Sequence, residues 1–248
     1  MQEKYKVISE KINLLIAEKF AVHPLSHGIY ASNSELVLSQ YFAMSQAFPY
    51  LQAGAQRKQI KFAMESNLDM DQHFELTAVV GNFLCWDETG GHAVVRHFGN
   101  SGLSKILDTR KTFHANMLRN DIVTLTGKIL KPYYSKVTVA YLTELLEGLE
   151  SLDHIKRCAH MVAFENHAGI MIDAFWGSLS QCYEVPKDDL LYFKIHVGGT
   201  DPGEPYHIEM TERIVSEIVP DNKIDAFVGE FINAYGLNYD WCEVIKHQ

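Results

Sequence analysis

Apolar side chains recur at intervals of three and four residues along most of this 248-residue chain, and that period places them on one face of an α-helix. One such stripe, within residues 3–20, consists of Tyr5, Ile8, Ile12, Leu15, Ile16 and Phe20. Alternation with a period of two rarely persists, and no Asn-Gly or Asp-Gly pair separates β-branched runs, so β-hairpins are not expected. The pattern predicts an all-α chain.

Turn residues divide the periodic stretches into a series of predicted helices. Their bounds are 3–20, 34–62, 69–87, 92–99, 102–127, 134–151, 153–181, 186–197, 202–219 and 221–235. Pro132, Pro186 and Pro220 lie at or next to the ends of these helices and mark no domain boundary. We therefore predict a single helical domain over residues 1–248, built as one bundle.

Charge and composition exclude several classes of protein. The formal net charge is −9 and the basic residues are scattered, which argues against nucleic acid as a partner, because phosphate binding needs clustered Lys and Arg. The longest uncharged run, 36–56, is too polar to span a membrane, and no secretory signal is visible. The cysteines are far apart and show no metal or disulfide spacing: Cys85, Cys158, Cys182 and Cys242. We expect a cytoplasmic protein with reduced thiols and no membrane partner.

Glu165 is a carboxylate inside an otherwise apolar helical face. Its same-face neighbours are Cys158, Met161, Val162, Ala168, Gly169 and Ile172. A buried carboxylate is costly unless it is paired or bound to a metal. Glu165 is therefore predicted to be a metal ligand or a catalytic base, and the alternative is a rim residue paired with a basic side chain such as Arg157.

A second polar cluster follows the apolar segment 190–195. His196 ends that segment, while Glu204 and His207 lie three residues apart and share a face of the next predicted helix. The glycines at 198–199 and the proline at 202 interrupt the helix, so the chain can fold back and bring the two histidines together. The alternative for His196 is a favourable contact with the helix dipole at a C-terminus.

A third cluster surrounds two adjacent glycines at 90–91. Glu88 and His97 would lie on opposite faces of an unbroken helix, but the glycines allow Glu88 to end one helix and His97 to face it from the next. His92, four residues after Glu88, is the rival partner. Together the clusters offer carboxylate and imidazole ligands without thiolate, a set that fits iron or manganese better than structural zinc, and di-iron sites of this kind are built inside helical bundles.

The order of these segments resembles the heme-oxygenase-like di-iron oxidases, whose fold is shared by thiaminase-type TenA proteins, the cofactorless PQQ-synthesis oxidase and the chlamydial CADD protein. The resemblance runs from about residue 41 to residue 207. It is carried by Asn82 to Glu88 with a following histidine, by the mid-helix Glu165, and by the set His196, Glu204 and His207. The first motif has two extra residues, and the third is four residues longer than in the family.

The resemblance implies an up-down helical bundle that binds two Fe²⁺ ions and uses O2 as co-substrate. Glu88, His97 and Glu165 would hold one iron. His196, His207 and an acid, either Glu204 or Asp201, would hold the other, with Glu165 bridging the two. Glu88 and Glu165 would thus be catalytic as well as metal ligands.

By the same resemblance the chain is a non-heme di-iron oxidoreductase acting on a small molecule. The Gly-Gly-Thr-Asp-Pro segment is similar to small cyanobacterial CADD-like proteins, which include a nitrile-forming branch, and this favours an amino-acid-derived substrate of specialised metabolism. N-oxygenation, C–C cleavage and nitrile formation are the reactions considered. The predicted pocket walls are Phe83, Trp86, Phe164 and Tyr192. A homodimer and an external reductant are compatible with this class.

Two other classes of function stay open at this point. In a metal-free enzyme like the TenA or PQQ-synthesis proteins, the same histidines and acids would bind substrate directly. In a non-enzymatic helical binding protein they would be core residues. A heme oxygenase, with His23 or His27 as axial ligand, would leave Glu165 without a role. Iron stoichiometry separates the di-iron prediction from all of these.

Overall fold

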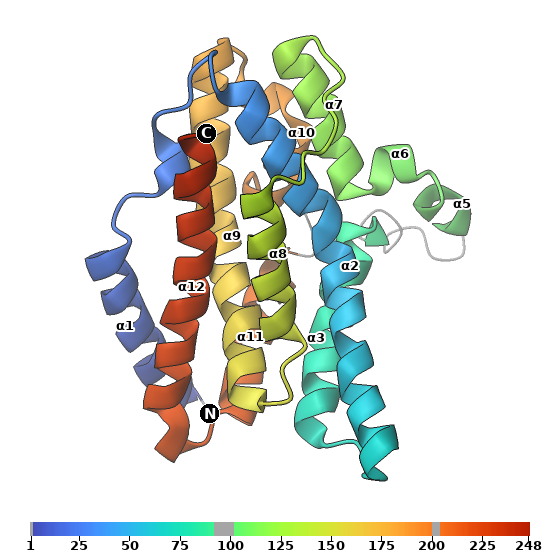
Figure 1. Cartoon of the computed structure of the whole chain (residues 1–248), viewed down its shortest axis with the longest axis vertical. Coiled ribbons are helices and arrows are strands. Elements are labelled where there is room, and N and C mark those ends of the chain that lie inside the picture. Colours follow the sequence, from blue (N-terminus) through green and yellow to red (C-terminus); the bar gives the residue numbers. More distant parts are fainter. Residues whose placement is uncertain (1, 92–101, 200–203) are drawn as a thin grey trace.

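The computed structural model describes residues 2–91, 102–199 and 204–248, and within these ranges it contains helices and no strand (Figure 1). The α-helices are α1 (Gln2–Lys19), α2 (Ser34–Ser66), α3 (Gln72–Glu88), α5 (Gly102–Ile106), α6 (Thr109–Thr112), α7 (His114–Thr126), α8 (Lys136–Leu149), α9 (His154–Tyr183), α10 (Leu191–Val197), α11 (Glu204–Ile218) and α12 (Ile224–Lys246). Short 3-10 helices are η1 (Pro24–Ser26), η2 (Lys187–Asp189) and η3 (Asp221–Lys223). The all-α prediction is confirmed.

Helix α9 lies at the centre of the bundle. It packs against α12 most extensively and also against α11, α8, α10 and α3, and Figure 1 shows the long helices running side by side along the vertical axis. On the other side of the bundle α2 packs against α3, α8 and α7. The predicted helical bundle is therefore confirmed, and its arrangement brings α3, α7, α9, α10 and α11 close to one another.

Local chemistry explains where several helices begin and end. Asp153 caps α9 by accepting hydrogen bonds from the backbone amides of Ile155 and Lys156, and Ser135 caps α8 in the same way. At the other ends, Asn67 after α2 and Gly127 after α7 adopt a left-handed backbone, with φ of 49° and 67°. That conformation closes a helix and is tolerated by Asn and Gly.

Three predicted helices differ from the structure. The predicted helix 186–197 is the 3-10 helix η2 followed by α10, because the backbone of Leu190 is extended. The predicted helix 102–127 is three helices, α5, α6 and α7, because Asp108 and Phe113 leave the helical conformation and the chain turns at each. The last helix extends to Lys246 instead of ending at 235, because Trp241, Cys242 and Ile245 continue its buried face. The predicted helix 92–99 lies outside the described residues.

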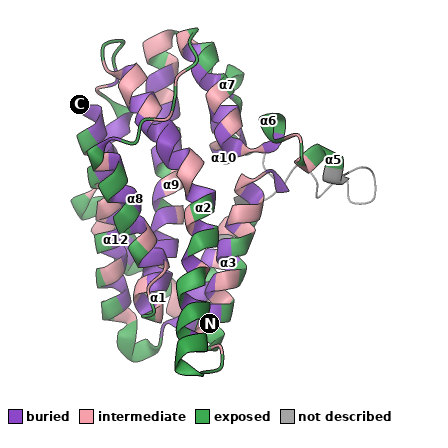
Figure 2. Cartoon of the chain, turned by 45° about the vertical axis from the view of Figure 1, so that its right-hand side comes forward, coloured by how far each residue is buried: buried purple, intermediate pink, exposed green. Residues whose placement is uncertain are grey.

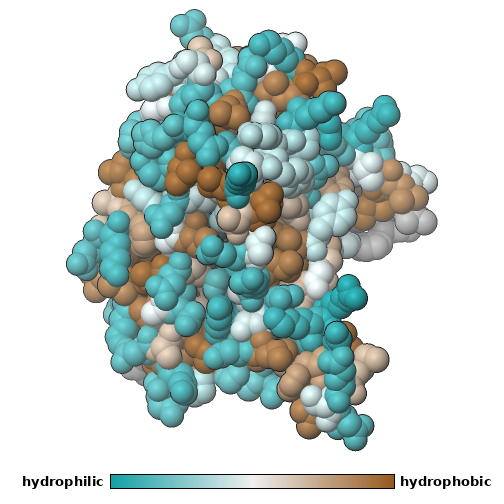
Figure 3. All heavy atoms as spheres, viewed as in Figure 1, coloured by the Kyte–Doolittle hydropathy of each residue, from teal (hydrophilic) through white to brown (hydrophobic). Residues whose placement is uncertain are grey.

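Each long helix turns an apolar side inward. Figure 2 shows buried residues along the inner sides of the helices and exposed residues along the outer sides, and hydrophilic side chains cover much of the face in Figure 3, with apolar atoms scattered between them. All four cysteines are free thiols. Among the described residues, no helix combines the length and the apolar character needed to cross a bilayer.

Candidate metal centre

Five helices direct imidazole and carboxylate side chains toward one region of the bundle. Helix α3 supplies the adjacent Asp87 and Glu88 at its C-terminal end, and α9 supplies Glu165 from its middle. The remaining side chains come from α7, α10 and α11, and they are His114, His196 and His207. They form two clusters, one around Glu88 and one around Glu165.

The first cluster consists of Glu88, His114 and His196. The Glu88 Oε1 lies 3.2 Å from Nε2 of His196, and its Oε2 lies 3.4 Å from Nδ1 of His114. The two imidazoles approach to 3.2 Å between Nδ1 of His114 and Nε2 of His196. Each residue offers one ligand atom within 4.8 Å of the other two, so one cation can reach all three.

The tautomer of His196 follows from its second contact. Its Nδ1 lies 2.7 Å from the backbone carbonyl of Tyr192, and because a carbonyl can only accept, the ring nitrogen must donate. Nε2 is the ring nitrogen that contacts Glu88 and His114, and in the neutral tautomer with its proton on Nδ1 it is the nitrogen that can bind a metal. Histidines that bind metals in proteins are typically oriented by such a hydrogen bond from the other ring nitrogen.

The Glu88 carboxylate is ionised in this surrounding. Burial by itself would raise its pKa, but His114 and His196 outweigh that effect and hold the pKa well below its usual value. Its side chain is only 12% exposed. A buried carboxylate that keeps its charge requires a cation or a set of hydrogen-bond donors around it. A cation bound between Glu88 and the two imidazoles would meet this requirement.

The second cluster consists of Glu165, His207 and Asp87. The Glu165 Oε2 lies 3.2 Å from Nδ1 of His207, and Asp87 Oδ2 lies 3.3 Å from Nε2 of the same ring. Phe83 packs edge-on against His207, with ring centroids 5.6 Å apart. Both nitrogens of His207 therefore face carboxylates, which come from α9 and α3.

A small cavity of about 50 Å³ lies between the two clusters. Its polar lining is Ser45, Glu88, Glu165, Tyr192, His196 and His207. Its apolar walls are Met44, Phe48, Phe164, Ala168, Gly169, Met171 and Ile172. The Phe48 and Phe164 rings stack at 4.2 Å between centroids. The carboxylates and histidines thus surround a mostly apolar space large enough for a small group.

A wider hollow of about 300 Å³ adjoins this cavity and shares Glu165, Gly169 and His207 with it. Its rim includes Asn166, which is exposed, and Ile170, which is 47% exposed. The hollow therefore reaches the surface, and the three shared residues mark the passage between the hollow and the cavity.

A buried carboxylate holds the start of α10, the helix that carries Tyr192 and His196. The two oxygens of Asp121 accept hydrogen bonds from the backbone amides of Leu191 and Tyr192, at 2.9 and 2.8 Å. Such contacts satisfy amides that have no partner inside the helix. Burial raises the pKa of Asp121 to about 6, although these hydrogen bonds act in the opposite direction.

The structure brings four of the predicted site residues, Glu88, Glu165, His196 and His207, around one cavity. His97, the rival His92 and Asp201 lie outside the described residues. Glu204 is the first residue of α11, and its side chain also lies outside the described part. The ligand roles of these residues stay predictions.

The predicted pocket walls divide into two groups. Phe164 and Tyr192 line the cavity, while Phe83 packs on His207. Trp86 does not border the cavity, and its ring fills the space that a side chain at position 91 would need. Pairing of Arg157 with Glu165 is wrong, because that guanidinium donates to Thr77 and to two backbone carbonyls instead.

Sequence reasoning missed His114 and Asp87. His114 shares a helical face with Met117, Leu118 and Asp121, all buried. A histidine on an apolar face is the same kind of signal that singled out Glu165. Asp87 stands beside Glu88 at the end of α3 and is 1% exposed. Adjacent residues point to different sides of a helix, so a pattern that places Glu88 at the site does not predict Asp87 there.

Comparison with known proteins adds information on the fold. No protein-family model matches the chain, and no curated protein is significantly similar to it in sequence. Two crystal structures of a CADD-like protein of unknown function from Nostoc punctiforme are similar to it. One aligns with a TM-score of 0.71 and 13% identity over 99% of this chain and 98% of that chain. The other aligns with a TM-score of 0.68 and 13% identity over 99% and 95%.

The chain shares the CADD-like fold. The alignment covers both proteins almost completely, so the likeness concerns the whole bundle rather than one pair of helices. At 13% identity it concerns the fold alone, and a fold hosts many functions. The chemistry of this chain therefore has to be argued from its own side chains.

Proposed function

We propose that this chain is a non-heme di-iron oxidoreductase that activates O2 to oxidise a small, amino-acid-derived substrate. The observation that carries the proposal is the cluster of Glu88, His114 and His196, in which two imidazoles and a buried carboxylate each place one ligand atom within 4.8 Å of the other two. A site of this kind is completed by a metal cation, since the neighbouring donors are imidazole nitrogens and carboxylate oxygens.

The residues present fit one iron ion and supply part of a second site. Glu88, His114 and His196 would hold the first ion, because each offers a ligand atom within 4.8 Å of the other two. Glu165 and one nitrogen of His207 would be ligands of the second ion, while Asp87 faces the other nitrogen of that ring. The described residues of both clusters contain no thiolate, which favours iron or manganese over structural zinc. Glu165 as a bridge, and His97, Asp201 or Glu204 as further ligands, stay part of the proposal. Bundles that bind two irons use the same combination of glutamates and histidines from several helices.

Two ferrous ions would supply the electrons with which dioxygen is activated. The chain's own residues have three tasks around them. Tyr192, through its carbonyl, orients His196. Phe48 and Phe164 keep water out of one side of the cavity, because stacked aromatic rings offer it no hydrogen bond. The hydroxyls of Ser45 and Tyr192 are the polar contacts available to a substrate inside the apolar walls.

Iron stoichiometry tests the proposal. The metal-free protein is loaded with Fe(II) without oxygen, the bound iron is counted, and the loaded protein is mixed with O2 while visible absorption is followed. We expect about two irons per chain and a transient absorption band. Glu165→Gln and His196→Gln should each lower the iron count, whereas Glu18→Gln and His27→Gln, which change exposed residues of the same types, should not.

A folded chain that binds no stoichiometric iron would sink the di-iron proposal. The TenA-like metal-free enzyme or the helical binding protein would then account for the cavity. Circular dichroism of each variant establishes that a lower iron count does not result from unfolding, because loss of the helices removes the far-UV signal.

A further inference from the structure

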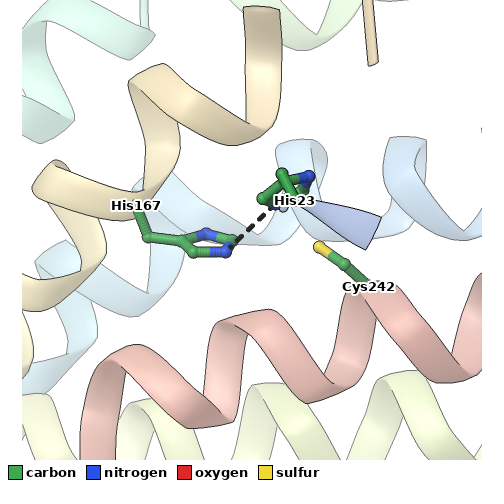
Figure 4. Close-up of side chains that lie close together, drawn as sticks. All are labelled: His23, His167 and Cys242. Carbon is green, nitrogen blue, oxygen red and sulfur yellow. Dashed lines mark hydrogen bonds between the residues drawn. The ribbon is translucent and has the colours of Figure 1, made fainter. Parts of the chain in front are cut away.

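A second group of ligating side chains lies on the far side of α9 from the candidate metal centre. His23 precedes η1, His167 belongs to α9 and Cys242 to α12. All three are buried, with 7%, 1% and 0% of their surface exposed. Figure 4 shows the two rings next to each other and the Cys242 sulfur pointing toward them. His167 follows Glu165 by two residues, so the two side chains leave the helix in nearly opposite directions.

The distances suit one small ion. Nε2 of His23 lies 3.2 Å from Nε2 of His167, and the three ligand atoms, including Sγ of Cys242, all lie within 4.8 Å of one another. They come from elements that pack directly on each other, since η1 and α12 both contact α9 and each other. An ion placed between the three atoms would need little movement of the backbone.

The group is electrically neutral in the protein without an ion. Burial, reinforced by the charge of Lys246, lowers the pKa of His23 to about 4. Burial also raises the pKa of the Cys242 thiol, and no carboxylate belongs to the group. One thiolate can neutralise only one positive charge. Nearby Lys246 and Glu243 already pair with each other at 3.0 Å, so a divalent ion would leave a net positive charge in the buried group, which is costly.

We propose that His23, His167 and Cys242 form a binding site for one monovalent copper ion. A thiolate with two imidazoles is a soft ligand set that selects Cu(I), and Cu⁺ with one thiolate adds no net charge to the dry interior. This inference is independent of the proposed iron site, because the two groups share no residue and His167 and Glu165 leave α9 in nearly opposite directions.

Binding involves no change of oxidation state. The Cys242 thiol releases its proton to solvent as the Cu–S bond forms. His23 at present accepts a hydrogen bond at Nδ1 from the Leu25 amide, over 3.2 Å, so its proton is on Nε2. For Nε2 to bind copper, that proton moves to Nδ1 and the Leu25 hydrogen bond is lost. His167 needs no such change, because its Nε2 already accepts from His23.

The test is an anaerobic competition between the full chain and the colorimetric Cu(I) chelator bicinchoninate. The measurement uses a Cys85→Ser/Cys182→Ser background, because those two thiols are partly exposed and would bind copper on their own. We expect the chain to withdraw one Cu(I) from the chelator. Cys242→Ser should weaken binding on the order of a hundredfold or more. Cys158→Ser, which changes another buried thiol, and Glu165→Gln, which changes the iron site, should bind copper as before.

The proposal is overturned if the chain withdraws no copper, or if Cys242→Ser withdraws as much as the parent chain. Should that variant fail to fold, X-ray absorption of the copper-loaded parent chain decides. One sulfur and two nitrogen neighbours support the site, and a shell without sulfur, or with two sulfurs, overturns it. Copper binding that persists in Glu165→Gln while its iron count falls separates this proposal from the proposed function.

Discussion

The candidate metal centre depends at the residue scale on which nitrogen of each imidazole is available. The contact with the Tyr192 carbonyl places a proton on Nδ1 of His196, so Nε2 is the nitrogen that takes part in the Glu88 cluster. Glu88 in turn keeps its charge because two histidines counteract its burial. The geometry thus makes His114 as important as the residues singled out from the sequence.

His114→Gln tests that importance. Glutamine cannot replace an imidazole ligand at the same place, so we expect iron binding to fall from about two ions per chain to about one, with the Glu165 cluster still occupied. The measurement is bound iron after anaerobic loading. His73→Gln, on a half-buried histidine far from the cavity lining, is the matched control. Two irons retained in His114→Gln would show that His114 is not a ligand.

The element scale concerns how α3 ends and how α7 and α10 begin. Gly90 follows α3 with a φ of 101°, a conformation that L side chains rarely adopt, and a Cβ there would lie 2.6 Å from Thr112. This contact joins the end of α3 to the segment just before His114. The same turn therefore places Glu88 and His114 next to each other.

Gly90→Ala should destabilise the fold by about 2 kcal/mol or more, because the new methyl group meets both backbone strain and Thr112. It should also weaken iron binding at the Glu88 cluster. Gly54→Ala is the control, since a Cβ at that helical position meets nothing within 4 Å and alanine is expected to stabilise a helix interior by about 0.5–1 kcal/mol. Urea unfolding measures both effects, and equal stabilities would contradict the prediction.

Asp121→Asn tests how α10 is held. The pKa of Asp121 is about 6 in the folded chain and 3.8 when unperturbed. The folded state therefore binds this proton more tightly, and the stability that this adds is complete below about pH 3.8 and lost as the pH rises through about 6. The total is at most about 3 kcal/mol. Asparagine cannot titrate, so its stability relative to the parent chain should rise between pH 4 and pH 7.

Unfolding free energies of the metal-free proteins, measured across that pH range, decide the matter. A stability difference between Asp121→Asn and the parent chain that falls as the pH rises would mean that the two backbone hydrogen bonds outweigh burial. Asp240→Asn, which changes an exposed carboxylate of α12, is the control and should show no such trend.

At the scale of the whole molecule, the bundle encloses a small cavity that adjoins a wider hollow. The cavity and the outer hollow share Gly169 on α9, and a Cβ at that position would meet no atom within 4 Å. The absence of a side chain there keeps the passage open between solvent and the two carboxylates. Gly169 and His167 are two positions apart on α9, so the passage and the cluster of His23, His167 and Cys242 lie on different sides of this helix.

Gly169→Phe should close that passage. We expect Fe(II) uptake to slow on the order of tenfold or more, with the final iron count unchanged, because the ligands themselves are intact. Gly169→Ala should behave as the parent chain, and Gly229→Phe, which adds the same ring to open surface on α12, is the control for bulk. Stopped-flow measurement of iron loading gives the rates, and an unchanged rate in Gly169→Phe would contradict the assignment.

Sequence alone located most helices, because their signals are local. Apolar spacing predicted α2, α3, α8 and α9 closely, and capping residues such as Asp153 lie within a few positions of the amides they bind. The same spacing predicted one helix where the structure has α5, α6 and α7, because the apolar pattern does not show that the backbone is extended at Phe113. It also ended α12 too early, where a buried asparagine at 238 interrupts the apolar pattern.

The sequence by itself determined the helical fold class and the choice of Glu88, Glu165, His196 and His207 as candidates, because a charged or imidazole side chain on an apolar face is visible within a few helical turns. Only the tertiary structure decided their partners. His196 meets His114 across 82 positions and Glu88 across 108, and such contacts depend on how whole helices pack. Apolar spacing carries no information about contacts between residues so far apart in the sequence. The places of His114, Asp87 and the cluster around Cys242 were therefore found only in the assembled bundle.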